Sequence, residues 1–187
     1  AAKEQAYDDL AALLTATSDP AVVVLGPPGA GKSTLLRRLE LDMAIAGLRG
    51  EGATEGGRGD AGAAGVASTA RDTVTFFIQL NHYKSERPGA PPPPPGDSLA
   101  ERWSAAYPDL PPLGALLGEG RMVLLLDALN EMPAANEREY RERVGLWKDW
   151  LNRLAREQPG NRVVFSCRAL DYSAPLVTPT LRVPLGQ

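Results

Sequence analysis

The segment from residue 21 to residue 46 constrains the fold more than any other part of the chain. Residues 21–25 form a short, wholly apolar and mostly β-branched run, which is typical of a strand covered on both faces. A turn rich in Gly and Pro follows, and residues 32–46 then place leucines and Met43 on one helical stripe with charges opposite. The segment therefore predicts a β-turn-α unit.

The turn of this unit carries the pattern G-x-x-x-x-G-K-[ST], which between a strand and a helix predicts a phosphate cradle. Glycines let backbone N–H groups point inward, and the helix that follows adds the positive end of its dipole. Lys32 would supply a mobile charge to the β- and γ-phosphates, and Ser33 would bind Mg²⁺. The alternative is an ordinary Gly-rich turn with an exposed lysine. The predicted cradle consists of Gly26, Pro27, Pro28, Gly29, Ala30, Gly31, Lys32 and Ser33.

A carboxylate closes another apolar run, residues 122–127, which we expect to be a strand. Asp127 has no structural reason to end such a strand unless it pairs or coordinates a metal. Ligands of open α/β sheets collect at the carboxyl ends of strands. We therefore expect Asp127 to complete the Mg²⁺ site, with a helix N-cap as the alternative role.

The remaining patterns alternate between strands and helices, which predicts an α/β fold with a parallel, doubly wound sheet. Asn136 and Glu139 have capping-box spacing, and the helix after them places Trp147 and Trp150 in the core. The other expected strands are 74–80, 162–166 and 180–184, and the other expected helices are 3–17, 99–107 and 113–117.

The 187 residues fit one domain, in which residues 1–20 hold a helix leading into a nucleotide-binding unit at 21–187. Residues 47–72, rich in Gly and Ala, predict a mobile loop, or alternatively a contact surface for a partner. Residues 88–97 predict a polyproline spacer, or alternatively a ligand of an aromatic groove. The first and last residues suggest a piece of a longer, multidomain protein.

The charge and the cysteine content exclude some partners and favour one compartment. A net charge of −3 and a pI near 5.3 give no general attraction for nucleic acid or anionic lipid. The longest apolar runs are strand-sized, so no membrane segment is expected. The lone Cys167 cannot form an internal disulfide, which favours a cytoplasmic location; we expect a small buried thiol there.

Three segments together resemble the NACHT family of STAND-class P-loop NTPases, and a bacterial-type NACHT module is suspected. They are VVVLGPPGAGKSTLLRRL at 22–39, MVLLLDALNEMP at 122–133 and RVVFSCRALDY at 162–172, and VTFFIQLNHYK at 74–84 extends the match. The resemblance implies a three-layer P-loop sandwich with a five-stranded parallel sheet of order 5-1-4-3-2 and helices on both faces. It also implies that residues Gly26 to Thr34 cradle nucleotide phosphates, that Asp127 holds Mg²⁺ through water, and that Arg168 senses the γ-phosphate.

The residues after Asp127 depart mildly from the family pattern. Many members have Gly in place of Ala128 and Asp in place of Asn130. Asn130 could orient a water but cannot accept its proton, which leaves Glu131 as the candidate base. Arg168 also has a case of its own, because a guanidinium at a strand end offers a forked donor to a phosphate. Its alternative is a surface pair with Asp171 or a glutamate.

The functions that these motifs allow fall into different classes. The first is Mg²⁺-dependent binding and slow hydrolysis of ATP, acting as a conformational and oligomerisation switch on flanking effector and sensor domains in a signalling or defence protein. The second is an AAA+-like ATPase, although such proteins usually carry Glu directly after the Asp where this chain has Ala128. The third is a nucleotide-binding assembly module without useful turnover. ATP is favoured over GTP because no guanine-specifying motif is apparent.

Overall fold

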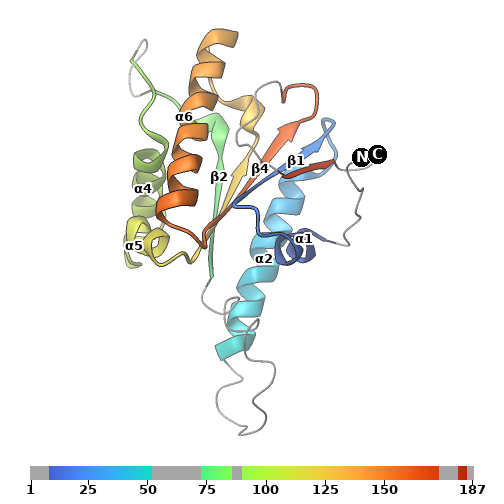
Figure 1. Cartoon of the computed structure of the whole chain (residues 1–187), viewed down its shortest axis with the longest axis vertical. Coiled ribbons are helices and arrows are strands. Elements are labelled where there is room, and N and C mark those ends of the chain that lie inside the picture. Colours follow the sequence, from blue (N-terminus) through green and yellow to red (C-terminus); the bar gives the residue numbers. More distant parts are fainter. Residues whose placement is uncertain (1–8, 52–72, 86–89, 173–180, 185–187) are drawn as a thin grey trace, which may run out of the picture.

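The computed structural model describes residues 9–51, 73–85, 90–172 and 181–184. Strands and helices alternate along these residues (Figure 1). The strands are β1 (Ala21–Gly26), β2 (Val74–Gln79), β3 (Met122–Asp127), β4 (Arg162–Arg168) and β5 (Leu181–Pro184). The helices are α1 (Leu10–Ala16), α2 (Lys32–Glu51), α4 (Pro95–Ala106), α5 (Leu113–Gly118) and α6 (Glu137–Glu157), with the short 3₁₀ turns η1 (Leu80–His82) and η2 (Leu129–Glu131).

The sheet has the order β2-β3-β4-β1-β5, and every neighbouring pair is parallel. The expected five-stranded sheet is corrected at one edge, where the fifth strand is shorter than the other four. The four strands whose side chains the structure describes run in the order 1-4-3-2, and they are six or seven residues long. The fifth, β5, is a four-residue backbone segment beside β1, and its side chains lie outside the described residues.

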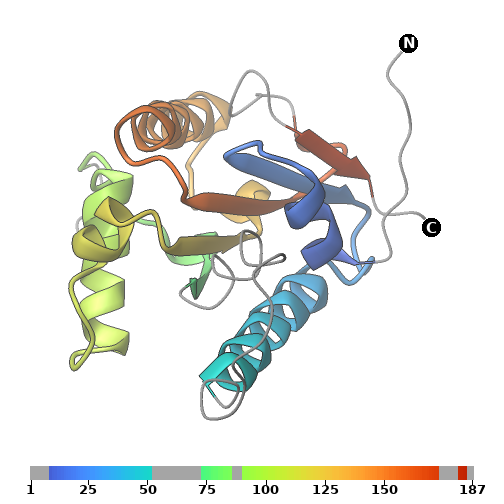
Figure 2. The same cartoon turned by 60° about the horizontal axis from the view of Figure 1, so that its bottom comes forward.

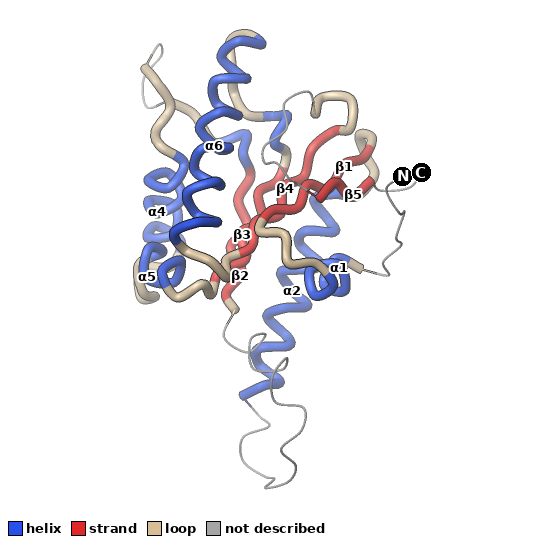
Figure 3. The backbone as a smooth tube through the Cα atoms, viewed as in Figure 1, coloured by secondary structure: helices blue, strands red, loops and turns tan. Residues whose placement is uncertain are grey.

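Helices cover both faces of this sheet, so the chain folds as three layers (Figures 2 and 3). Alternate residues of a strand point to opposite faces. Along β3, Met122, Leu124 and Leu126 pack into the core beneath α4, α5 and α6, while Val123 and Leu125 join the core beneath α1 and α2. All six residues of β3 are buried, which explains why its first five residues are apolar on both faces.

Three helix boundaries differ from the sequence expectation. Helix α1 begins at Leu10, with Asp9 as its N-cap, whereas the expected helix began at residue 3; residues 3–8 lie outside the description. Helix α2 continues through residues 47–51, which had been assigned to the loop, and Arg49 in its last turn complements the helix dipole. Its distal half projects beyond the sheet (Figure 1). Helix α4 begins at Pro95, inside the expected spacer, because proline is well suited to the first turn of a helix. Residues 52–72 and 88–89 lie outside the description.

Helix α6 confirms the capping prediction. The Asn136 side chain accepts a hydrogen bond from the Glu139 N–H at 3.0 Å, and Glu139 accepts from the Ala135 N–H at 2.7 Å. Trp147 and Trp150 are 1% and 8% exposed and meet edge to face, as expected of core residues. The helix is thereby fixed against the sheet, and its first turn lies close to the carboxyl end of β3.

The opposite end of β3 is tied to β4 by one buried amide. The Asn161 side-chain oxygen accepts from the Met122 N–H at 3.0 Å, and its nitrogen donates to the carbonyls of Leu117 and Gln158. These bonds satisfy backbone groups at the ends of α5 and α6, which would otherwise be buried without partners. The two strands that carry the candidate site therefore start from a common anchor.

Candidate functional site at the strand ends

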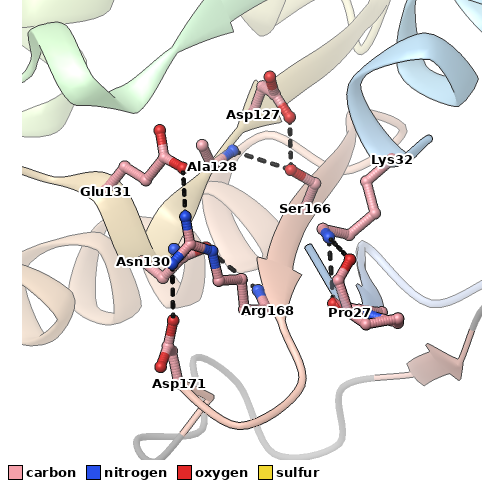
Figure 4. A network of polar contacts seen from close by, with 10 residues as sticks. Pro27, Lys32, Asp127, Ala128, Asn130, Glu131, Ser166, Arg168 and Asp171 are labelled. Carbon is pink, nitrogen blue, oxygen red and sulfur yellow. Dashed lines mark hydrogen bonds and ion pairs between the residues drawn. The ribbon is translucent and has the colours of Figure 1, made fainter. Parts of the chain in front are cut away.

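The carboxyl ends of β1, β3 and β4 meet around a pocket of about 340 Å³. Parallel pairing brings these ends to one edge of the sheet, the position where ligands of open α/β sheets collect. Side chains that are distant in sequence come together here (Figure 4). The pocket is lined by Pro28, Gly29, Gly31, Lys32, Ser33, Thr34, Asp127, Ala128, Asn130, Glu131, Ser166 and Arg168.

The loop between β1 and α2 has the backbone that its glycines permit. Gly29 and Gly31 have φ of 76° and 77°, a left-handed conformation that L side chains rarely adopt. Helix α2 begins at Lys32, and its first regular bond runs from the Leu35 N–H to the Gly31 carbonyl at 2.8 Å. The first N–H groups of a helix have no acceptor within it, so this loop presents donors toward the pocket.

Lys32 folds back onto its own loop. Its ammonium group donates to the carbonyl oxygens of Gly26 and Pro27 at 3.0 and 2.8 Å (Figure 4). The side chain bridges the start of the loop to the start of α2, and it holds a positive charge at the pocket wall. A bound anion could replace these carbonyl oxygens as the partner of the Lys32 ammonium group.

Asp127 is 2% exposed at the end of β3. One of its carboxylate oxygens accepts a hydrogen bond from the Ser166 hydroxyl on β4, and that hydroxyl in turn accepts from the Ala128 N–H at 2.8 Å. The N-cap position of η2 is Ala128, and it has no side-chain cap bond, so Asp127 does not play the alternative role of helix cap. Ala128 itself has φ of 60° and ψ of 55°, a strained conformation for a residue with a Cβ.

The oxygen donors of the pocket suit Mg²⁺. Ser33 and Asp127 both line it and supply a hydroxyl and a carboxylate, the hard ligands that this ion prefers. Within the described ranges, no group of three or more His, Cys, Asp or Glu side chains could enclose a metal. A magnesium ion here would therefore take its other ligands from water or from phosphate oxygens, which is its usual habit in proteins.

Glu131 and Arg168 face each other at the outer rim of the pocket. The Arg168 guanidinium donates to a Glu131 carboxylate oxygen at 3.2 Å, and both side chains are nearly half exposed, at 44% and 45%. A second guanidinium nitrogen lies 4.0 Å from Asp171. The surface pairing considered as the alternative for Arg168 is therefore present, on a side chain that also lines the pocket.

Asn130, within η2, makes a hydrogen bond to the end of β4. Its side-chain oxygen accepts from the Arg168 backbone N–H at 3.1 Å. The same residue lines the 340 Å³ pocket and a neighbouring hollow of about 440 Å³ bounded by Glu137, Tyr140, Leu170 and Asp171. Asn130 thus has a positioning contact, and its role with water stays a prediction.

Most of the predicted residues gather at the pocket, and two others were missed. Gly26, Pro27 and Ala30 do not line it, although the carbonyls of the first two hold Lys32. Ser166 and Ala128 line it without having been predicted. The available signal for Ser166 was a hydroxyl within an otherwise apolar strand, two residues before Arg168. His82, in contrast, is exposed on η1 and does not line the pocket.

Cys167 does not line the pocket. It is fully buried in the core beneath α6, as expected, and burial raises the pKa of its thiol to about 11. A neutral, enclosed thiol is a poor nucleophile and a poor metal ligand.

Comparisons with known proteins give a likeness of fold alone. No family model matches the chain, and no curated protein matches it. A solved chain in the E. coli MS115-1 HORMA:CdnC:Trip13 complex is similar over 96% of this chain, with a TM-score of 0.50 and 18% sequence identity. The match spans 52% of that chain, so the present chain corresponds to about half of its length.

These findings correct the family assignment. The motifs resembled the NACHT family of STAND-class P-loop NTPases, but no family model matches the chain, and the solved chain to which it is similar belongs to a HORMA:CdnC:Trip13 complex. The family names, and the signalling and defence roles that came with them, are therefore withdrawn. Separately, the described residues include no helix with the length and apolar character needed to span a bilayer.

Proposed function

We propose that this chain binds a nucleoside triphosphate together with Mg²⁺ and hydrolyses it slowly. The observation that carries the proposal is the convergence, in one pocket, of Lys32 and Ser33 with Asp127, Glu131 and Arg168. Three separate segments bring a cation, hard oxygen ligands, a carboxylate base and a guanidinium to the end of one parallel sheet. This combination suits the binding and transfer of a phosphoryl group.

Each side chain has a role that its position supports. Lys32 and the N–H groups at the start of α2 would hold phosphate oxygens. Ser33 and Asp127 would hold Mg²⁺, which when bound offsets phosphate charge and polarises the phosphoryl group. Glu131 would accept the proton of an attacking water, with Asn130 helping to orient it, and Arg168 would contact the terminal phosphate.

ATP is the favoured nucleotide, since the sequence contains no recognisable guanine specifier. The output of such a site would be a change in how this domain contacts flanking domains or further copies of itself. The structural neighbour was solved within a multiprotein complex, which is compatible with a protein partner. A cytoplasmic location stays a prediction.

Nucleotide binding by the purified chain tests the proposal. Titration with a fluorescent ATP analogue and Mg²⁺ should give saturable binding that Lys32→Ala abolishes. Lys84→Ala is the matched control, because Lys84 is an exposed lysine that does not line the pocket. Absence of binding in the parent chain, or equal binding by Lys32→Ala, would overturn the proposal.

One observation favours a second candidate, a nucleotide-binding assembly module without useful turnover. The candidate base Glu131 is engaged by Arg168 in this structure, and if that pair persists with nucleotide bound, the nucleotide would be held without hydrolysis. Phosphate release separates the two candidates. Retention of ATP over many hours, with no phosphate released, would favour the assembly module.

A further inference from the structure

The Ser166 hydroxyl lies at the centre of the polar contacts behind the pocket. Ser166 is 1% exposed on β4, and its hydroxyl donates to Asp127 while accepting from the Ala128 N–H at 2.8 Å (Figure 4). A hydroxyl has a single hydrogen to donate. The orientation of the Ser166 hydroxyl is therefore set by Asp127 and Ala128. In turn, the hydroxyl restrains the Asp127 carboxylate and the Ala128 backbone.

These contacts begin where the pairing of β3 with β4 ends. Backbone register between β3 and β4 runs to the pair Leu126 and Phe165. One residue beyond Asp127, Ala128 turns the chain with its φ of 60°, and the strands can no longer exchange backbone bonds. Side chains continue the connection, first through Ser166 to Ala128 and then through Asn130 to the Arg168 N–H.

The buried carboxylate needs this support. Asp127 is 2% exposed, and Ser166 is its one side-chain donor among the residues that the structure describes. A carboxylate removed from water is unfavourable unless donors or a cation compensate it. With one oxygen held by Ser166, the other points away from that contact (Figure 4), on a side chain that lines the pocket.

We propose that Ser166 is a positioning residue for the Mg²⁺-nucleotide site. It fixes the rotation of the Asp127 carboxylate, and it holds the left-handed turn at Ala128 that carries Glu131 toward the pocket. This inference rests on the proposed function. Partners that orient a metal-binding side chain typically change metal affinity by about 10- to 100-fold when removed.

The test measures metal dependence separately from nucleotide binding. Retention of a fluorescent ATP analogue is followed while Mg²⁺ is titrated, and again in excess chelator. Ser166→Ala is expected to raise the Mg²⁺ concentration for half-maximal retention about tenfold or more, with little change in chelator. Ser166→Thr keeps the hydroxyl and should restore the parent value. Ser98→Ala is the matched control, because Ser98 is a buried serine on α4 outside the pocket.

A third variant keeps the test decisive if Ser166→Ala does not fold. Ser166→Cys preserves the size of the side chain but replaces the hydroxyl with a weak donor, so it should also raise the Mg²⁺ requirement. An unchanged Mg²⁺ midpoint in the folded Ala or Cys variant, with the parent still binding nucleotide, overturns the role of Ser166 alone. Failure of the parent to bind nucleotide at all overturns the proposed function, and this inference with it.

Discussion

The guanidinium of Arg168 donates to the carboxylate of Glu131 at 3.2 Å, which joins the end of β4 to the turn that follows β3. Both groups are close to half exposed, and ion pairs in such positions typically contribute about 0 to 1 kcal/mol to stability. Little free energy is therefore lost when Arg168 leaves Glu131 for another anion. A terminal phosphate would attract Arg168 away from Glu131 and leave that carboxylate free to accept a proton.

Glu131→Gln tests this carboxylate as the base. The amide cannot accept a proton, so phosphate release should fall by about 100-fold or more while nucleotide binding persists. Glu142→Gln is the control, because Glu142 is an exposed glutamate on α6 that also pairs with an arginine. Equal phosphate release by Glu131→Gln and the parent chain would remove Glu131 from the proposed chemistry.

Arg168→Ala tests contact with the terminal phosphate. Hydrogen bonds to charged groups contribute about 1.5–3 kcal/mol, so triphosphate affinity should fall roughly 10- to 100-fold. Diphosphate affinity should change much less. Calorimetric titration of both nucleotides gives the ratio, with Arg138→Ala as control, since Arg138 is 89% exposed on α6. A uniform loss for both nucleotides would contradict a specific role at the terminal phosphate.

Ala128→Gly is expected to stabilise the fold. Ala128 has φ of 60°, where a Cβ is unfavourable by about 1–2 kcal/mol, and the greater freedom of Gly in the unfolded chain offsets part of this. A net gain of about 0.5–1 kcal/mol should appear as a higher urea midpoint. Ala44→Gly, at an exposed position within α2, should instead destabilise by about 1 kcal/mol. Parallel losses in the two variants would show that the turn is not strained.

The thiol of Cys167 should resist alkylation in the folded protein. Burial raises its pKa to about 11 from an ordinary 9.0, so the fold favours the neutral thiol. That contribution to stability is fully present below pH 9.0 and is lost as the pH rises through about 11. Iodoacetamide at about pH 8 should label it slowly in native buffer and rapidly in concentrated urea, as mass spectrometry would measure. Rapid native labelling would mean that the core beneath α6 opens readily.

The sequence predicted those parts of the fold that depend on local patterns. The limits of β3 follow from an apolar run closed by Asp127, and the cap of α6 follows from the spacing of Asn136 and Glu139. The end of α2 was misplaced because the glycines at 47 and 50 suggested a loop, whereas the helix continues through them. The start of α4 was misplaced because five consecutive prolines concealed a helical first turn.

The sequence was sufficient to predict which residues form the site, but not which of them contact one another. Lys32, Ser33 and Asp127 belong to short patterns with a recognisable chemistry. The bonds from Ser166 to Asp127 and from Arg168 to Glu131 join residues 39 and 37 positions apart. They depend on the register of β3 against β4, which no local pattern encodes. The family assignment failed for a related reason. Short phosphate cradles recur in many proteins, so a family assignment needs a match to a family model, and none was found.

The contact between Lys32 and its own loop has a consequence for the energetics of binding. Its ammonium group already has the carbonyls of Gly26 and Pro27 as acceptors. A phosphate that recruits Lys32 therefore exchanges hydrogen bonds and does not simply add them, and only the difference contributes to affinity. The loop is also ordered before the ligand arrives, so little conformational entropy remains to be lost. We therefore expect the affinity of this loop for different anions to depend more on the charge density of the anion than on the number of hydrogen bonds it makes.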